Sequence, residues 1–230
     1  MLEFSLPGGG LKGITLVGTL IALRDRKIIP DIVTGISAGA YAGYMTYSGM
    51  NRQKILKWFA LSRNHFYKRS LSWYLPPYDV QGEYVKKMSR PYLVERADFD
   101  RYGIRKFYVG YTTLPRFKFE SVDILDNYCK HQAYEKVMKS SLVPFVTHYA
   151  PHFEGAIDGS FRRLFFASPE EPKERWLFTL GDLYIFRNHS KEFDRVIRLD
   201  TKIKSLTRAR TSDLIDEFDI GYEQGLKITA

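Results

Sequence analysis

Gly35-Ile36-Ser37-Ala38-Gly39 follows a β-branched run, Ile32-Val33-Thr34, and precedes a series of small residues. This order predicts a strand, a sharp turn and a helix. A serine at such a turn has a strained backbone and an exposed hydroxyl, and the glycines let strand and helix approach closely. The free N–H groups at the start of the helix favour negative charge there. Ser37 is therefore a candidate nucleophile, although the pattern alone also fits an ordinary glycine turn before a buried helix.

A second glycine-rich turn, Gly8-Gly9-Gly10-Leu11-Lys12-Gly13, follows an alternating segment at residues 2–6. Apolar residues at helical spacing then predict a buried helix over about residues 11–26. The unit is strand, helix, strand, with parallel strands and a right-handed crossover. Both turns therefore lie at the carboxyl ends of neighbouring strands, where open α/β sheets bind ligands. The triple glycine, Gly8-Gly9-Gly10, is the candidate oxyanion hole, and the backbone N–H of Ala38 would add a donor.

The first turn also satisfies the G-x-G-x-x-G spacing of a dinucleotide-binding loop. That fingerprint requires an acidic residue at the end of the second strand. Here Asp31 lies at the start of that strand, and Thr34-Gly35 lies at its end. The Walker pattern fails because Gly13 and Ile14 occupy its last positions. A nucleotide site is the weaker interpretation, and the sequence predicts no cofactor and no metal.

The composition is that of a globular domain, with 44% hydrophobic and 27% charged residues in a chain of 230. No window approaches the roughly 18 apolar residues that span a bilayer. The opening residues lack the features of a signal peptide, and the single cysteine, Cys129, excludes an internal disulfide. We expect a cytoplasmic or peripheral membrane protein, with export without a cleaved signal left open.

The net charge of +9 lies in the first half of the chain. Residues 1–115 hold 17 Lys+Arg and 8 Asp+Glu, and residues 116–230 hold 18 of each. No acidic residue lies between Asp31 and Asp79, which suits an anionic partner such as phospholipid headgroups or nucleic acid.

Residues 51–105 are predicted to be a cap or membrane-facing insertion within a single domain of residues 1–230. Over 51–77, bases alternate with Trp58, Tyr67, Trp73 and Tyr74, as suits an anionic bilayer interface. Two alternatives remain: buried aromatics beneath a solvated basic face, or a nucleic-acid site at 51–70. Nucleic acid is the less expected partner.

Later in the chain, alternation and apolar runs predict strands and helices at regular intervals. The strands are expected near 106–113, 117–120, 153–157, 176–180 and 196–199, and the helices near 132–139 and 211–225. Asp158-Gly159-Ser160 follows one of these strands. Asp158 is a candidate general base, with an ordinary Asp-Gly turn as the alternative.

Five histidines are available as a base: His65, His131, His148, His152 and His189. The order Ser37, Asp158, His189 formally fits an α/β-hydrolase triad. That fold places its nucleophile after several strands, whereas only two strands precede Ser37 here. A histidine base is therefore the less favoured interpretation.

Taken together, the two glycine-rich turns and Asp158-Gly159-Ser160 resemble the three motifs of patatin-like phospholipases. Ser140-Ser141-Leu142-Val143-Pro144-Phe145 also resembles the segment ahead of the family's aspartate motif. The resemblance covers residues 2 to about 160 and implies a calcium-independent Ser–Asp dyad. The matching motif positions are Gly8, Gly13, Gly35, Gly39, Gly159 and Ser160.

Residue by residue, the resemblance implies that Ser37 is the nucleophile, Asp158 the general base, and Gly9 and Gly10 the oxyanion glycines. Pro7 stands where the family often has aspartate, and Ser160 where it usually has glycine or alanine. Both departures lie beside the active positions, so they bear on substrate preference and rate rather than on mechanism.

We therefore expect an α/β fold: a three-layer α/β/α domain with a mostly parallel central sheet. The expected function is hydrolysis of fatty acyl esters of phospholipids or related lipids through an acyl-enzyme. A catalytically weak membrane-binding module of the same fold is the alternative. The expected partners are an acyl lipid substrate and a membrane surface, and the oligomeric state stays open.

Overall fold

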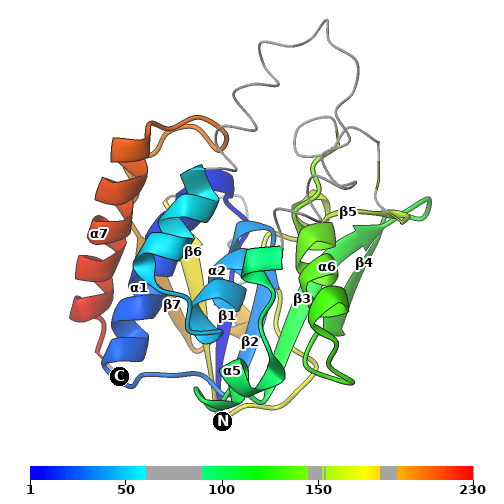
Figure 1. Cartoon of the computed structure of the whole chain (residues 1–230). Coiled ribbons are helices and arrows are strands. Elements are labelled where there is room, and N and C mark those ends of the chain that lie inside the picture. Colours follow the sequence, from blue (N-terminus) through cyan, green and yellow to red (C-terminus); the bar gives the residue numbers. More distant parts are fainter. Residues whose placement is uncertain (61–89, 145–151, 153, 182–190, 230) are drawn as a thin grey trace, which may run out of the picture.

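The computed structural model describes residues 1–60, 90–144, 152, 154–181 and 191–229, and its centre is a mostly parallel sheet (Figure 1). The strand order is β4-β3-β2-β1-β6-β7, and β5 pairs with β3. Only β4 and β5 run antiparallel to their neighbour in the described sheet. The strands are β1 (Leu2–Leu6), β2 (Ile32–Ile36), β3 (Lys106–Thr113), β4 (Lys118–Asp123), β5 (Ala156–Asp158), β6 (Glu174–Leu180) and β7 (Arg195–Leu199).

Helices cover one face of this sheet, where α7, α1, α2 and α6 lie side by side (Figure 1). The α-helices are α1 (Gly13–Asp25), α2 (Ala38–Tyr47), α5 (Arg96–Asp100), α6 (Lys130–Ser140) and α7 (Thr211–Lys227). Short 3-10 turns are η1 (Gly10–Lys12), η2 (Arg90–Tyr92) and η3 (Gly159–Phe161), and residues 52–60 are also helical.

The opposite face of the sheet is covered, among the described residues, by the extended segment 162–169. Its Phe166 packs against Ile32 and Ile36, and the Phe166 carbonyl accepts hydrogen bonds from the hydroxyls of Ser5 and Thr34, both at 2.8 Å. The hydroxyls of Ser5 and Thr34 lie on the face of the sheet opposite the helices, because successive side chains of a strand alternate between the two faces. The predicted α/β fold, a mostly parallel sheet flanked by helices, is confirmed.

Helix α1 is buried on every side, as its almost uniformly apolar sequence predicts. Every residue from Gly13 to Leu23 is buried, because α1 lies between the sheet and α7. Glycines bring α1 and α7 into close contact: a Cβ on Gly221 would lie 2.0 Å from the Thr15 carbonyl oxygen. The hydroxyl of Thr15 donates to the buried carboxylate of Glu217 at 2.5 Å. The C-terminal helix is therefore part of the core.

Part of the predicted insertion at 51–105 belongs to the core. Trp58 packs on Tyr41 with ring centroids 4.2 Å apart, and its indole N–H donates to Tyr134. Phe59 is 2% exposed. The half-buried Trp58 therefore packs partly as the alternative of buried aromatics expects. Residues 61–89 of the predicted insertion at 51–105 lie outside the described residues, so the cap or membrane-facing surface stays a prediction.

In the described part of the chain, no helix combines the length and apolar character needed to cross a membrane.

Candidate active site

Ser37 lies in the sharp turn between β2 and α2. Its backbone has φ 53° and ψ −120°, a left-handed conformation that a non-glycine residue adopts only under strain. The flanking glycines are required by space: a Cβ on Gly35 would lie 2.7 Å from the Ala40 Cα, and one on Gly39 would lie 2.3 Å from the Leu6 carbonyl oxygen. The predicted strand–turn–helix around Ser37 is confirmed.

The pairing of β3 explains how Asp158 reaches Ser37. The last residue of β2, Ile36, pairs with Gly110, and Asp158 at the end of β5 pairs with the next residue, Tyr111. Strand β4 occupies the other edge of β3. Strand β5 therefore pairs with the same edge of β3 as β2 does, beyond the last residue of β2, and runs in the opposite direction. The ends of β2 and β5 therefore meet, and the side chains of Ser37 and Asp158 come together.

The carboxylate of Asp158 is 2% exposed and surrounded by hydroxyl and N–H donors. The Ser160 N–H donates to Oδ1 at 2.7 Å, and the hydroxyls of Ser37 and Ser160 lie close enough to the carboxylate to lower its pKa. Burial raises the pKa of Asp158, and these groups counter part of that rise. Asp158 is therefore a stronger base than a solvated aspartate and contacts the hydroxyl that it would deprotonate.

The glycine-rich turn after β1 lies directly against these two side chains. A Cβ on Gly8 would lie 2.2 Å from the Ser160 Oγ and 3.5 Å from the Ser37 Cβ. The N–H of Gly8 donates to the Leu164 carbonyl at 3.0 Å. By contrast, three N–H groups make no hydrogen bond to any described residue: those of Gly9, Gly10 and Ala38. They are available to an oxyanion.

Comparison with known proteins identifies the family. The sequence matches the family described as patatin-like phospholipase over residues 4–215. The chain belongs to the patatin-like phospholipase family. Among solved structures, VipD from Legionella pneumophila superposes with a TM-score of 0.60 at 16% identity, covering 98% of this chain and 66% of VipD. At that identity the likeness shows the fold.

Two further solved structures are similar over part of their length. The type III effector ExoU gives a TM-score of 0.48 at 15% identity, and the ExoU–SpcU complex of Pseudomonas aeruginosa gives 0.49 at 13%. Each alignment covers 98% of this chain but only 52% and 50% of the other. This chain therefore spans about half to two thirds of these structures. No curated protein sequence matches it.

Within this patatin-like domain, the two departures from the family motifs have different surroundings. Pro7 is buried, and its carbonyl oxygen would lie 2.6 Å from a Cβ on Gly39, so it packs under the nucleophile turn. Ser160, in contrast, contacts the predicted base directly through its N–H and its hydroxyl. Of the two, only Ser160 adds a polar group to the site.

Sequence reasoning missed the role of Ser140. This residue is buried at the end of α6; its Oγ accepts the Ser37 N–H at 2.8 Å and donates to the Gly110 carbonyl at 2.6 Å. Two residues later, the Leu142 carbonyl accepts the Asp158 N–H at 2.7 Å. The segment that resembles the family's pre-aspartate motif therefore binds the backbone of both Ser37 and Asp158. The resemblance was the only signal, and it assigned no role.

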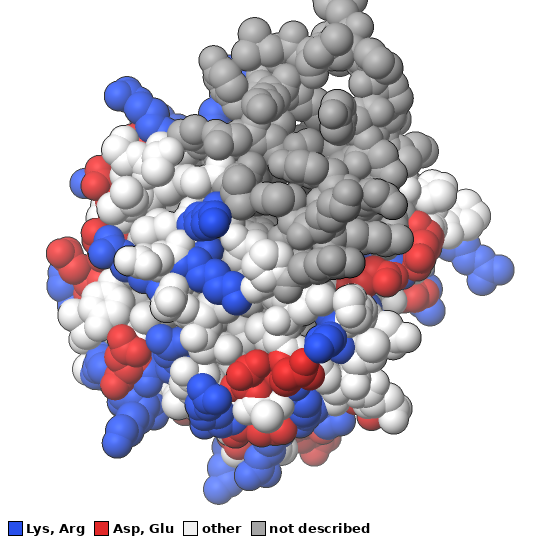
Figure 2. All heavy atoms as spheres, in the orientation of Figure 1, with Lys and Arg blue, Asp and Glu red and all other residues white. Residues whose placement is uncertain are grey.

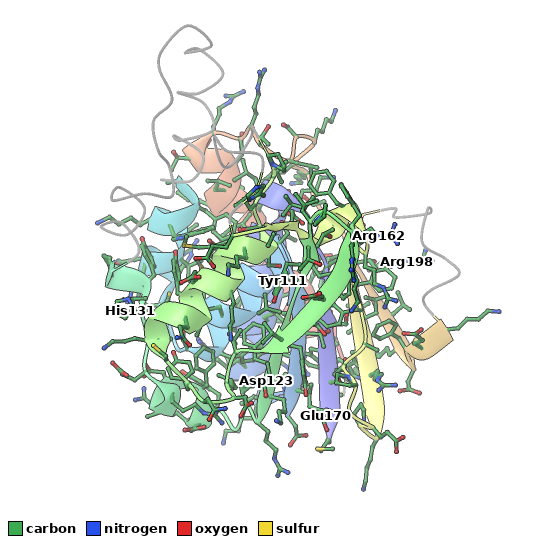
Figure 3. All side chains as sticks on the ribbon, turned by 90° about the vertical axis from the view of Figure 1, so that its right-hand side faces the viewer. Tyr111, Asp123, His131, Arg162, Glu170 and Arg198 are labelled. Carbon is green, nitrogen blue, oxygen red and sulfur yellow. The ribbon has the colours of Figure 1, made fainter. Side chains whose placement is uncertain are left out.

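The described histidines lie away from this site. His131 is exposed on α6 (Figure 3), and His152 is exposed and accepts the Gly155 N–H. The other three, including His189 of the alternative triad, lie outside the described residues.

Among the described residues, no three His, Cys, Asp or Glu side chains gather in a way that could hold a metal ion. Asp31 accepts the Leu2 N–H at 2.8 Å at the amino end of the strands. It therefore lies at the wrong end of the sheet for the dinucleotide interpretation.

Proposed function

We propose that this domain is a serine acyl hydrolase that cleaves fatty acyl esters of phospholipids or related lipids through the Ser37–Asp158 dyad. One observation carries the proposal: the Ser37 hydroxyl lies beside a buried carboxylate of raised pKa and stabilises its charged form. A hydroxyl on a strained turn beside such a base is the arrangement of an activated nucleophile. Family membership supports the lipid ester as the substrate class.

In the first half-reaction, the Ser37 Oγ attacks the ester carbonyl while Asp158 takes the hydroxyl proton. Negative charge moves to the carbonyl oxygen, where the N–H groups of Gly9, Gly10 and Ala38 would receive it. One such donor is worth about 3–4 kcal/mol in the transition state. The tetrahedral intermediate then collapses, the protonated Asp158 gives its proton to the leaving lysolipid oxygen, and an acyl-Ser37 ester remains.

In the second half-reaction, Asp158 takes a proton from water, and the resulting hydroxide attacks the acyl ester. The same N–H groups stabilise the second oxyanion. Collapse releases the fatty acid and returns the proton to Ser37. No step needs a metal or a histidine. The reaction would take place on lipids at a membrane surface, so we infer a peripheral mode of action.

Hydrolysis of p-nitrophenyl butyrate tests the proposal. Ser37→Ala and Asp158→Asn each reduce kcat by about a thousandfold or more, and the two losses are similar because members of one catalytic unit are not additive. His131→Ala, as the matched control, stays near wild type. Residual activity of either dyad variant within about tenfold of wild type, or about 1.4 kcal/mol in barrier, contradicts the assignment.

A further inference from the structure

The two ends of the sheet differ in how their charges are balanced. At the amino ends of the strands, cations are paired with acids: Arg175 with Glu3 at 3.1 Å, Arg105 with Asp31 at 3.3 Å and Lys106 with Asp123 at 3.1 Å. Figure 3 shows two acidic residues, Asp123 and Glu170, toward this lower end. Several cations at the end remote from Ser37 are therefore paired with acids, although Lys27, Lys173 and Lys227 form no ion pair with a described residue.

At the end that carries Ser37, bases predominate in the described loops, although Asp213 at the start of α7 accepts the Arg210 N–H. Three loops frame the site, at residues 7–13, 159–169 and 201–210, and none contains an acidic residue. They contain seven bases: Lys12, Arg162, Arg163, Lys202, Lys204, Arg208 and Arg210. Lys12 is half-buried and the other six are exposed. None of the seven forms an ion pair with any residue that the structure describes.

Hydrogen bonds and close contacts fix these loops beside the dyad. The Leu206 carbonyl accepts the Leu11 N–H at 2.8 Å, and it would lie 2.4 Å from a Cβ on Gly10. The loop 201–210 is thus attached to the glycine-rich turn. The loop 159–169 begins immediately after Asp158, and Arg162 lies toward the upper end of the sheet in Figure 3. These contacts attach the loops 159–169 and 201–210 to the end of the sheet that carries Ser37 and Asp158, and the Arg163 guanidinium lies over the Phe119 ring.

Two large apolar side chains stand among these bases. Phe161 is 50% exposed and Leu206 is 53% exposed. We call the seven bases together with Phe161 and Leu206 the basic rim. Figure 2 shows that Lys and Arg side chains are spread over this face of the molecule with Asp and Glu side chains among them. Exposed apolar groups set among unpaired cations are typical of surfaces that contact a membrane interface.

We propose that the basic rim is the surface through which this domain docks on an anionic phospholipid bilayer. The inference rests on the proposed function, since the ester bonds of a bilayer lipid lie just beneath its phosphates. Cations of the rim bind phosphates, and Phe161 and Leu206 enter the interface. Docking in this orientation brings the Ser37 hydroxyl to the depth of the ester carbonyl. The opposite end of the sheet, where several cations are paired with acids, faces the solvent.

Vesicle binding by the Ser37→Ala protein tests the rim without turnover. The rim variant carries Arg162→Gln, Lys204→Gln and Arg208→Gln, none of which belongs to the dyad or the oxyanion donors. Lys27→Gln, Lys173→Gln and Lys227→Gln form the matched control, because they remove the same charge from exposed lysines remote from the rim. Binding is measured on vesicles of phosphatidylcholine with phosphatidylserine and on vesicles of phosphatidylcholine alone.

A cation near an anionic bilayer strengthens binding by about fivefold, so the rim variant binds the mixed vesicles roughly 100-fold more weakly. The control stays within about threefold, and added salt reduces the difference between the two. Leu206→Gln weakens binding to the mixed vesicles, whereas Leu226→Gln, which changes an equally exposed leucine at the far end of α7, does not.

Equal binding by the rim and control variants overturns the inference. So does a result in which the rim variant loses affinity for duplex DNA while wild type shows none for the mixed vesicles. In the active background, p-nitrophenyl butyrate is hydrolysed equally by wild type and the rim variant. If wild type does not hydrolyse this soluble ester, the proposed function fails, and the vesicle result still tests the rim.

Discussion

Ser160→Ala is expected to move the acidic limb of the pH profile. The Ser160 N–H donates to Asp158 Oδ1 at 2.7 Å, and the Ser160 hydroxyl also stabilises the carboxylate. The substitution removes the hydroxyl alone, and a hydrogen bond to a charged group contributes about 1.5–3 kcal/mol. The pKa of Asp158 therefore rises above its wild-type value in the variant.

The sign of the effect on activity follows from the role of the base. Asp158 must be ionised to accept the proton of Ser37, so kcat/KM falls as pH drops through the pKa of Asp158 in the free enzyme. Burial already raises this pKa above the ordinary value. Losing a donor that stabilises the carboxylate raises it further, so the acidic limb moves to higher pH. Activity on the alkaline plateau changes much less.

The assay is kcat/KM for p-nitrophenyl butyrate across pH, because this neutral ester does not itself titrate in the acid range. Ser160→Gly, which restores a residue usual for the family, gives the same limb as Ser160→Ala if the hydroxyl is responsible. Ser212→Ala, at an exposed serine of α7, leaves the limb in place. If the acidic limb stays in place or moves to lower pH in both Ser160 variants, the Ser160 hydroxyl does not stabilise the Asp158 carboxylate.

The remaining predictions concern the stability of the site. Ser37→Gly is more stable than Ser37→Ala by about 1–2 kcal/mol in urea unfolding, since both lose the hydroxyl but only glycine relieves the strain at φ 53°; equal stability argues against strain. The raised pKa of Asp158 means that the folded state binds the Asp158 proton more tightly than the unfolded state does. The contribution of this proton to stability is present at low pH and is lost as pH rises from the unfolded-state pKa through the folded-state pKa. Asp158→Asn therefore raises the melting temperature more at pH 7 than at pH 4, and a gain that does not depend on pH contradicts this. Ser140→Ala leaves the buried Ser37 N–H unpaired, so unfolding free energy falls by about 1–3 kcal/mol and kcat falls with it; normal kcat would show that Ser140 does not position the nucleophile.

Much of the fold follows from local sequence pattern. The strand at 106–113 and the closing helix from Thr211 are recognisable because alternation and helical spacing depend only on nearby residues. The turn at Ser37 is equally local, since the glycines on either side permit a close approach that side chains forbid. These features are confirmed with small differences at their ends.

The parts that sequence reasoning missed depend on contacts between distant segments. Asp158 pairs with the residue of β3 that comes directly after the partner of Ile36. This position depends on the register of three strands, which the spacing of residues in the sequence does not encode. The hydrogen bond from Ser37 to Ser140 joins residues 103 apart in the chain. The bases of 201–210 lie beside the site only because Leu206 binds Leu11. Trp58 was expected at a membrane surface, but tertiary packing turns it toward Tyr41.

Labelling with a fluorophosphonate probe, followed by mass spectrometry of the peptides, tests the central claim most directly. The probe forms a stable adduct only with a serine whose hydroxyl is activated and whose oxyanion is stabilised. We predict a single adduct on Ser37, with labelling strongly slowed in Asp158→Asn and unchanged in His131→Ala. An adduct on another serine, or full-rate labelling of Ser37 in Asp158→Asn, would contradict the dyad.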